Sequence, residues 1–427
     1  MATTPIDPAP RTYPPFVALQ RRSARRWEAA PGQSGFEAIE AWLLGDAAAQ
    51  DDTLPCFEQL VWRLVAAGLP LDRASLHVGT LHPQIYGFAW NWNVDDGFCD
   101  EVKVAEEANQ SDAYRRNPLF GVIEHGTAYH GKTTDPEAVA RHPLMSELAK
   151  QGIADYLAVP LRAGGQYHNA ATVATKRAGG FSDEELASLR YVLKLFALHV
   201  ERQIQRRIAG NVLDTYLGAA AGGRVLDGLI KRGAGEPIRS VIWVSDLRGF
   251  TDLSERLSGP DMIALLNAYF GCLAGAVLDH GGEVLKFIGD GLLAVFPFAG
   301  FATEKAAAEA ALAAAEQALA DLDRLNAAPP AEIAAVAGWH PLRTGIALHD
   351  GEVFFGNVGA PARLDFTVIG RAVNAASRVE ALSKTLGRPI LITEAVAGRL
   401  GQPLDDLGRH ALRGVVQPIA IFSPPLA

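Results

Sequence analysis

Two aspartates, each at the end of an apolar stretch, constrain this chain of 427 residues more than any other feature. Asp246 closes the run at 240–246, Ser-Val-Ile-Trp-Val-Ser-Asp, which predicts a buried strand. Asp290 lies in Gly-Asp-Gly between two further apolar runs, a pattern typical of a hairpin whose glycine supplies a positive φ. If the strands before Asp246 and Asp290 are parallel and joined by a helical crossover, the two carboxylates meet at one edge of a sheet. Such a pair favours Mg²⁺ or Mn²⁺, as in a two-metal phosphoryl-transfer site.

Each aspartate alone also has a structural explanation, because Asp-Gly is common in hairpins and an Asp at a strand end often caps a helix. A third segment, 365–382, predicts a strand, a glycine turn and a helix. Asn374 and Arg378 are four residues apart on that helix and share a face. An amide and a guanidinium there suit a ribose and a phosphate, although a solvated polar face also explains this segment alone. The three segments taken together favour a catalytic site.

These segments belong to five blocks that follow one another in the order found in a known family. The blocks are 244–251, 283–291, 343–352, 355–359 and 366–378. Over residues 236–425 the sequence resembles a class III nucleotidyl cyclase catalytic domain. The resemblance implies an α+β domain of the ferredoxin-like type, with a mostly antiparallel sheet backed by helices.

The resemblance also implies a metal site. Asp246 and Asp290 match the family's metal-binding aspartates, and the backbone carbonyl of Leu247 stands where the family provides a further ligand. It implies two Mg²⁺ or Mn²⁺ ions in each active site.

The remaining matches concern the nucleotide. Lys286 and Thr367 match the pair that reads the purine, and lysine with threonine is typical of adenylyl cyclases, whereas guanylyl cyclases typically have glutamate and cysteine. Asn374 matches the residue that orients the ribose, and Arg378 the one that stabilises charge on the phosphates. The family's further phosphate-binding lysine has no clean match, and Arg413 is the nearest basic candidate.

We therefore expect an adenylate cyclase that converts ATP to 3′,5′-cyclic AMP and pyrophosphate. The resemblance implies a head-to-tail homodimer, formed through the cyclase domain, with two sites at its interface. A guanylate cyclase is one alternative, and Lys286 argues against it. A degenerate nucleotide-binding regulator is another, which the intact residues Asp246, Asp290, Asn374 and Arg378 disfavour.

The chain is long enough for several parts. We expect a poorly ordered tail at 1–34, a GAF-like α+β sensor at 35–200, a helical linker at 201–235 and the cyclase domain at 236–427. The sensor prediction comes from the order of its elements, and the closing helix begins at a capping box formed by Ser182 and Glu185. Helices are predicted at 35–49 and 56–68, and strands at 73–79, 84–91, 156–161 and 169–175.

A small-molecule ligand of unknown identity is a further expectation for this sensor. Histidines and aromatic residues suggest a ligand or haem pocket, but solvated histidines and core aromatics explain them as well. They are His125, His130, His142, Tyr86, Trp90 and Trp92.

The predicted closing helix carries an apolar stripe with steps of three and four residues. Such a stripe predicts packing on a partner helix, with a plain domain-closing helix as the alternative. Its members are Leu186, Leu189, Leu193, Phe196, Val200, Ile204 and Ile208.

Composition excludes some other classes of protein. A formal net charge of −9 disfavours binding to nucleic acid or to an anionic membrane. The three cysteines show no metal spacing and fit a reducing cytosol. We find no apolar run of the ~18 residues that a membrane helix needs, so we expect no transmembrane segment and a cytoplasmic location.

Overall fold

The computed structural model describes residues 6–32, 35–81, 85–162, 169–336, 339–415 and 417–425. The chain divides into two compact units, one that ends at Val212 and one that begins at Leu213. This boundary falls within the segment 201–235 that the sequence predicts as a linker. Each unit is described by itself.

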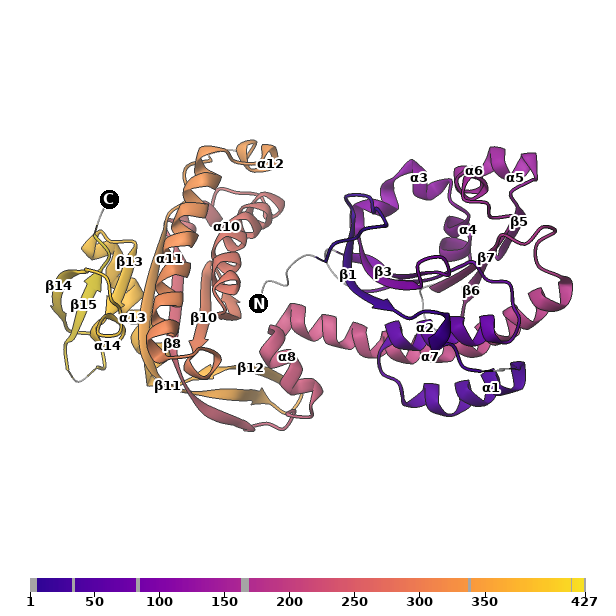
Figure 1. Cartoon of the computed structure of the whole chain (residues 1–427). Coiled ribbons are helices and arrows are strands. Elements are labelled where there is room, and N and C mark those ends of the chain that lie inside the picture. The colour runs from indigo at the N-terminus through magenta and orange to yellow at the C-terminus, as the bar shows by residue number, and fades with distance from the viewer. Residues whose placement is uncertain are drawn as a thin grey trace. The chain divides into compact units, whose positions relative to one another are not determined.

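An antiparallel sheet forms the centre of the N-terminal unit, in the order β1-β4-β3-β2-β7-β6-β5 (Figure 1). The predicted strands at 73–79 and 169–175 agree with β2 and β7, and β3 and β6 lie within a few residues of their predicted positions. Gln84, at the start of one predicted strand, lies outside the described residues. The strands are β1 (Val17–Ala24), β2 (Arg73–Gly79), β3 (Ile85–Asn93), β4 (Phe98–Ala105), β5 (Tyr129–Lys132), β6 (Asp155–Leu161) and β7 (Asn169–Thr175).

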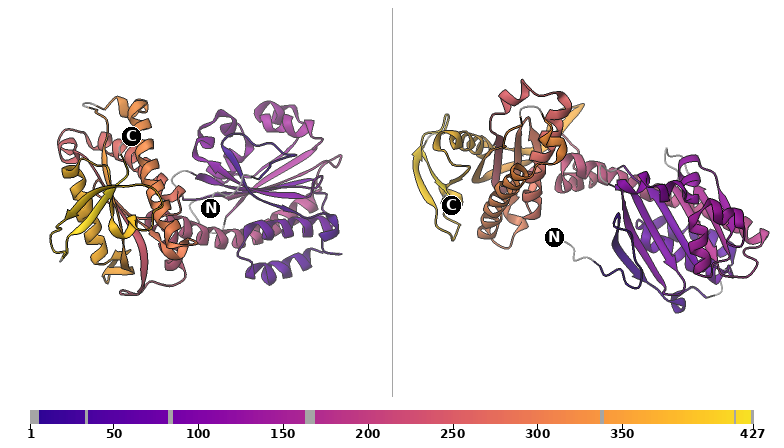
Figure 2. Two further views of the ribbon diagram at one scale, coloured as in Figure 1. Left: turned by 60° about the vertical axis from the view of Figure 1, so that its left-hand side comes forward. Right: turned by 90° about the horizontal axis from the view of Figure 1, so that it is seen from above.

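Helices cover both faces of this sheet, as the left view of Figure 2 shows. On one face α1 (Phe36–Leu44), α2 (Thr53–Ala66) and α7 (Asp183–Leu217) bury their apolar sides in one core. A smaller core on the other face includes residues of α4 and α6. The helices of the segment between β4 and β6 are α3 (Asp112–Arg115), α4 (Pro118–His125), α5 (Pro136–Arg141) and α6 (Pro143–Lys150).

The N-terminal segment differs from the expected poorly ordered tail. Residues 1–5, 33 and 34 lie outside the described residues, but β1 pairs along β4. Asp100 of β4 is fully buried and accepts hydrogen bonds from Tyr13 and Arg22 at 2.7 and 2.6 Å. Composition misled the prediction, because the arginines of this segment bind buried carboxylates of the sheet instead of remaining in solvent.

The long helix α7 begins at the predicted capping box. Ser182 N donates to Glu185 Oε2 at 2.7 Å, and Glu185 N donates to Ser182 Oγ at 3.2 Å. The apolar stripe from Leu186 to Ile204 lies in the core of its own unit, and Ile208 packs against that core. For these residues the structure agrees with the domain-closing interpretation, because the stripe packs within its own unit.

Polar contacts also hold the C-terminal part of α7 to the N-terminal unit. The Arg207 guanidinium donates to the buried Glu101 at 2.7 Å and lies 3.6 Å from the ring centroid of Phe88. Asn211 Nδ2 donates to Thr80 Oγ1 at 3.1 Å. The helix is therefore part of this unit as far as its boundary at Val212.

The second sheet has the order β14-β15-β13-β11-β8-β10-β9, and β12 pairs with the distal half of β11. Because β8 and β9 are both antiparallel to β10, they run parallel to each other with β10 between them. The strands are β8 (Gly235–Leu247), β9 (Glu283–Ile288), β10 (Gly291–Pro297), β11 (Thr344–Ala360), β12 (Arg363–Ile369), β13 (Ile390–Thr393), β14 (Asp405–His410) and β15 (Ile419–Ser423).

Alternation along these strands makes a three-layer α+β arrangement (Figure 1). Trp243, Phe296 and their neighbours face α10 (Gly259–Asp279) and α11 (Glu304–Ala327). The opposite face packs against α8 (Ala219–Leu226) and α13 (Arg371–Leu386). Short helices complete the unit: α9 (Phe250–Ser254), α12 (Ala331–Ala334) and α14 (Glu394–Ala397).

One helix departs from the expectation about membrane spans. Among the described residues, α10 alone has the length and apolar composition of a transmembrane helix. Its Leu265, Tyr269 and Leu273 are buried against the sheet and α11. A core helix passes the same test of length and composition, so this single helix is weak evidence for a span.

Candidate active site

The two aspartates meet at one edge of the second sheet. Asp246 is the register partner of Gly291, the residue after Asp290, so the end of β8 lies beside the tip of the β9–β10 hairpin. Gly289 in this turn has φ +64°, the left-handed conformation that the sequence predicted for a glycine. A Cβ on Gly291 would lie 3.0 Å from the Ser245 carbonyl oxygen, so this close approach of the backbones also favours glycine.

Electrostatics at this edge favour a cation. Burial raises the pKa of Asp246 to about 6, and the neighbouring charge of Asp290 and a hydrogen bond with its side chain contribute to the rise. The positive charge of Arg248 acts to lower the pKa of Asp246. Repulsion between two such carboxylates is relieved by a divalent ion, so the donor chemistry fits Mg²⁺ or Mn²⁺.

The donor set from side chains is small. Among the described residues no three His, Cys, Asp or Glu side chains form a group that could hold a metal. Backbone carbonyls and substrate oxygens would therefore have to complete the coordination around Asp246 and Asp290, as is usual for Mg²⁺. Leu247 provides a carbonyl immediately after Asp246, at the end of β8.

Buried hydroxyl groups fix the end of β8. Thr344 Oγ1 donates to the Asp246 carbonyl oxygen at 3.0 Å and lies 2.8 Å from the Tyr269 hydroxyl, in a buried contact. Gly249 follows with φ +76° and begins α9, so the chain turns sharply after the aspartate. These contacts hold the backbone of Asp246 in place and so position its carboxylate.

Lys286 and Thr367 lie on strands that contact each other, β9 and β12. Lys286 Nζ is 3.3 Å from Asp365 Oδ2. Asp365 and Thr367 are two residues apart on β12, so their side chains project from the same face. Thr367 is buried, and its hydroxyl has no hydrogen-bond partner among the described residues. An unpaired buried hydroxyl on a strand that contacts β9 fits a polar ligand.

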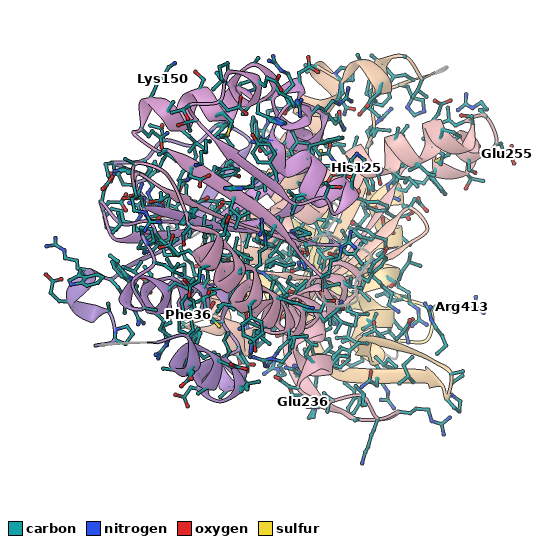
Figure 3. All side chains as sticks on the ribbon, turned by 90° about the vertical axis from the view of Figure 1, so that its right-hand side faces the viewer. Phe36, His125, Lys150, Glu236, Glu255 and Arg413 are labelled. Carbon is teal, nitrogen blue, oxygen red and sulfur yellow. The ribbon has the colours of Figure 1, made fainter. Side chains whose placement is uncertain are left out.

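Asn374 and Arg378 lie on α13, which follows β12 after Gly370, as the sequence predicted. Asn374 is exposed and Arg378 is partly buried. A Cβ on Gly414 would lie 3.4 Å from Arg378 Nη1, so the guanidinium reaches the loop that also carries Arg413. Arg413 itself is exposed on the C-terminal unit (Figure 3). Two guanidinium groups therefore belong to one region of the surface.

Sequence reasoning missed the residues beneath Asp246. Thr344 and Tyr269 hold its backbone, and Arg248 forms an ion pair with Glu380 of α13 at 2.6 Å. The only signal for Arg248 was its position two residues after Asp246, and nothing in the pattern connected it with α13.

The sequence of this unit matches a known family. Residues 237–418 match the family described as the adenylate and guanylate cyclase catalytic domain. The C-terminal unit contains a class III nucleotidyl cyclase catalytic domain. This confirms the family resemblance of the five sequence blocks and the α+β fold that it implied.

Individual relatives that match this domain are also named as cyclases. The chain is 37% identical over 174 residues to an adenylate cyclase of Anabaena cylindrica, covering 41% of this chain and 33% of that protein. It is 33% identical over 157 residues to adenylate cyclase 1 of Rhizobium meliloti, covering 36% of this chain and 22% of that protein. The chain thus spans a third or less of the length of these two relatives.

Solved structures include both kinds of cyclase. The adenylyl cyclase CyaB from P. aeruginosa is 29% identical, with a TM-score of 0.40, over 45% of this chain and 97% of that chain. The guanylyl cyclase Cya2 is 30% identical, with a TM-score of 0.38, over 44% of this chain and 92% of that chain.

The three histidines singled out in the sequence have separate surroundings in the described part of the N-terminal unit. His130 Nε2 lies 2.9 Å from Asp155 Oδ1, His142 Nδ1 lies 2.9 Å from the Arg116 carbonyl oxygen, and His125 is exposed at the end of α4 (Figure 3). Trp90 and Trp92 are buried in the main core, which is the structural explanation of these aromatics.

Proposed function

We propose that this protein is an adenylate cyclase that converts ATP to 3′,5′-cyclic AMP and pyrophosphate. The observation that carries the proposal is the pair Asp246 and Asp290, adjacent at one sheet edge of a cyclase domain. Two Mg²⁺ or Mn²⁺ ions would activate the ribose 3′-hydroxyl and hold the triphosphate. The remaining contribution of the protein is positioning and charge stabilisation, since phosphoryl transfer needs little covalent help.

In the proposed reaction the 3′-hydroxyl oxygen bonds to the α-phosphorus while the bond to pyrophosphate breaks. Asn374 orients the ribose, and the Arg378 guanidinium stabilises the charge that develops on the phosphates. Arg413 is proposed to contact the departing pyrophosphate, because it shares the loop that Arg378 reaches.

A homodimer formed through the cyclase domain is part of the proposal. Large apolar side chains are exposed on neighbouring strands of this unit, a feature that a second copy would cover. They are Phe287 and Ile288 of β9, Phe354 and Val358 of β11, and Ile369 of β12. Each site would then take its metal ligands from one chain and its nucleotide-binding residues from the other.

ATP is the proposed substrate because of Lys286 and Thr367. A lysine can donate to N1 of adenine, whereas guanine carries a hydrogen there. We expect kcat/KM for ATP to exceed that for GTP by at least tenfold, because a donor that meets another donor in the bound complex stays unpaired. Cyclic product from each nucleotide, separated by chromatography, measures this ratio.

Lys286→Ala should reduce that ratio toward one. Lys305, whose ammonium pairs with Glu309 on the exposed side of α11, provides the matched control Lys305→Ala, which should keep the preference. Equal kcat/KM values in the unmodified protein would contradict the proposed preference for ATP, and a higher value for GTP would favour the guanylate cyclase alternative.

We further propose that the N-terminal unit is a GAF-like sensor that regulates the cyclase domain in response to a small molecule. Its antiparallel sheet with helices on both faces and a closing helix supports this proposal. A polar group lies on the face toward α4 and α6, where Ser75 Oγ is 2.8 Å from His77 Nε2 and 2.6 Å from Thr172 Oγ1. Burial lowers the pKa of His77 to about 4, so its ring is neutral at pH 7.

Removal of residues 1–212 should change cyclase activity several-fold without abolishing it, because no proposed catalytic residue lies there. The cut follows Val212 because Gln203 and Ile204 of α7 are buried in the N-terminal unit. Initial rates at saturating ATP and Mn²⁺ compare the two proteins. Unchanged kinetics would mean that the N-terminal unit does not regulate the enzyme.

A further inference from the structure

An ion pair beneath the two aspartates links the metal-binding loop to α13. Arg248 follows Asp246 and Leu247, and its Nη2 donates to Glu380 Oε1 at 2.6 Å. The same nitrogen contacts Ser383 Oγ, one turn further along α13. Glu380 is 8% exposed and Arg248 is 25% exposed. The charged atoms are therefore largely removed from solvent. Their electrostatic interactions are stronger there than they would be in water.

The surrounding backbone leaves room for this pair. Gly345 of β11 is the register partner of Asp246, which places it directly beside the metal-binding end of β8. A Cβ on Gly345 would collide with Arg248 Nη2 and lie 2.6 Å from Glu380 Oε1. Any side chain here would displace the guanidinium, so a glycine at this register position is what allows the two charges to meet.

Arg248 has carboxylates on two sides, Glu380 on α13 and the aspartate pair at the sheet edge. Glu380 holds the guanidinium on the α13 side, while Asp246 lies two residues before Arg248 and Asp290 lies in the neighbouring β9–β10 turn. We expect an arginine released from Glu380 to turn toward these two aspartates, where its guanidinium would compete with a divalent cation. Net stability is a weak explanation for the pair, because burying two charges costs about as much as their attraction returns.

We propose that Glu380 is a positioning residue that holds Arg248 away from Asp246 and Asp290 and so keeps these carboxylates available for metal ions. Glu380 touches no reacting group and acts only through Arg248. The inference rests on the proposed two-metal function. It concerns the occupancy of the metal site, which binding measurements report without turnover.

The test is Mn²⁺ affinity of the full-length protein, measured by electron paramagnetic resonance of free Mn²⁺ with 3′-deoxy-ATP, which lacks the attacking hydroxyl. Glu380→Gln keeps an oxygen that can accept a hydrogen bond but removes the charge. We expect it to weaken Mn²⁺ binding by about tenfold or more, the range found for residues that orient metal ligands. KM for metal should rise in parallel, with a smaller change in kcat at saturating Mn²⁺.

The double variant Arg248→Gln/Glu380→Gln distinguishes positioning from a merely structural role. With the competing guanidinium also removed, Mn²⁺ affinity should return to within about threefold of the unmodified protein. Asp405→Asn is the matched control, because it breaks the Arg388–Asp405 ion pair of the same unit, 2.9 Å long, and should leave Mn²⁺ affinity unchanged.

Two results would overturn the inference: Glu380→Gln binding Mn²⁺ within twofold of the unmodified protein, or the double variant binding as weakly as Glu380→Gln. If Glu380→Gln does not fold, the double variant still decides, because its charges are balanced and its affinity must then be near normal. Failure of the proposed function would look different, since the unmodified protein itself would bind no Mn²⁺ with nucleotide.

Discussion

Asp246→Asn and Asp290→Asn should each lower cyclase turnover by at least about a hundredfold, because loss of a catalytic metal ligand costs several kcal/mol of transition-state stabilisation. Asparagine keeps the shape of the side chain and removes only the charge. Initial rates with ATP across a range of Mn²⁺ concentrations measure the loss. Asp252→Asn, an exposed carboxylate of α9 in the same region, is the control and should retain normal turnover.

Stability should change in the opposite direction to activity. Because the folded-state pKa of Asp246 is about 6, against an ordinary value of 3.8, ionising this group costs the metal-free fold free energy. The cost is absent below pH 4 and complete above pH 6, so the melting temperature of the metal-free protein should contain a component that falls between these values.

Asp290→Asn should remove part of that fall and raise the melting temperature at pH 7 by roughly 2–4 °C, which corresponds to about 1 kcal/mol. Mn²⁺ should raise the melting temperature of the unmodified protein and leave that of the variant unchanged.

The turnover measurement has its own contradicting result. If Asp246→Asn or Asp290→Asn keeps a tenth of the normal turnover, Asp246 and Asp290 are not the metal ligands.

Mixing two inactive variants should restore activity if the sites are shared between chains. Asp290→Asn protein lacks the metal ligand in both sites, and Arg378→Ala protein lacks the phosphate contact in both. A mixed dimer has one site with both defects and one with neither, because a two-fold axis relates the contributions. Random mixing makes about half of the dimers mixed, so roughly a quarter of normal activity should return.

Subunit exchange has to be demonstrated independently, for example by fluorescence transfer between differently labelled chains. Recovery should rise with protein concentration if the dimer is weak. A mixture of Asp290→Asn with Asp246→Asn is the matched control and should stay inactive, since both defects then fall on the same half of every site. An inactive first mixture despite exchange would place the whole site within one chain.

Local patterns predicted the elements around the candidate site because each of these elements is specified by a few neighbouring residues. The run that ends at Asp246, the Gly-Asp-Gly turn and the glycine before α13 each specify a strand end, a hairpin or a helix start. The order of the five blocks then predicted that these elements belong to a cyclase domain. The roles of Lys286 and Thr367 remain predictions, although the orphan hydroxyl of Thr367 is what a bound ligand would require.

Contacts between distant segments were not predictable from those patterns. Arg248 and Glu380 are 132 residues apart, and only the folded sheet brings them together beside Gly345. In the N-terminal unit β4 escaped prediction because Asp100 and Glu101 interrupt its apolar run, yet both are buried. Their countercharges come from Arg22 and Arg207, which lie far away in the sequence.

The pairing of β1 with β4 determines where this protein can be shortened. A chain that begins at residue 35, the boundary suggested by composition, would lose the strand that covers β4. Its exposed edge would present unpaired N–H and C=O groups to other molecules, which is a route to aggregation. Asp100 would also lose the Tyr13 hydroxyl and the guanidinium groups of Arg11 and Arg22, which are its countercharges. Size-exclusion chromatography should therefore show soluble monomers or dimers for a chain that begins at residue 6, and aggregates for one that begins at residue 35.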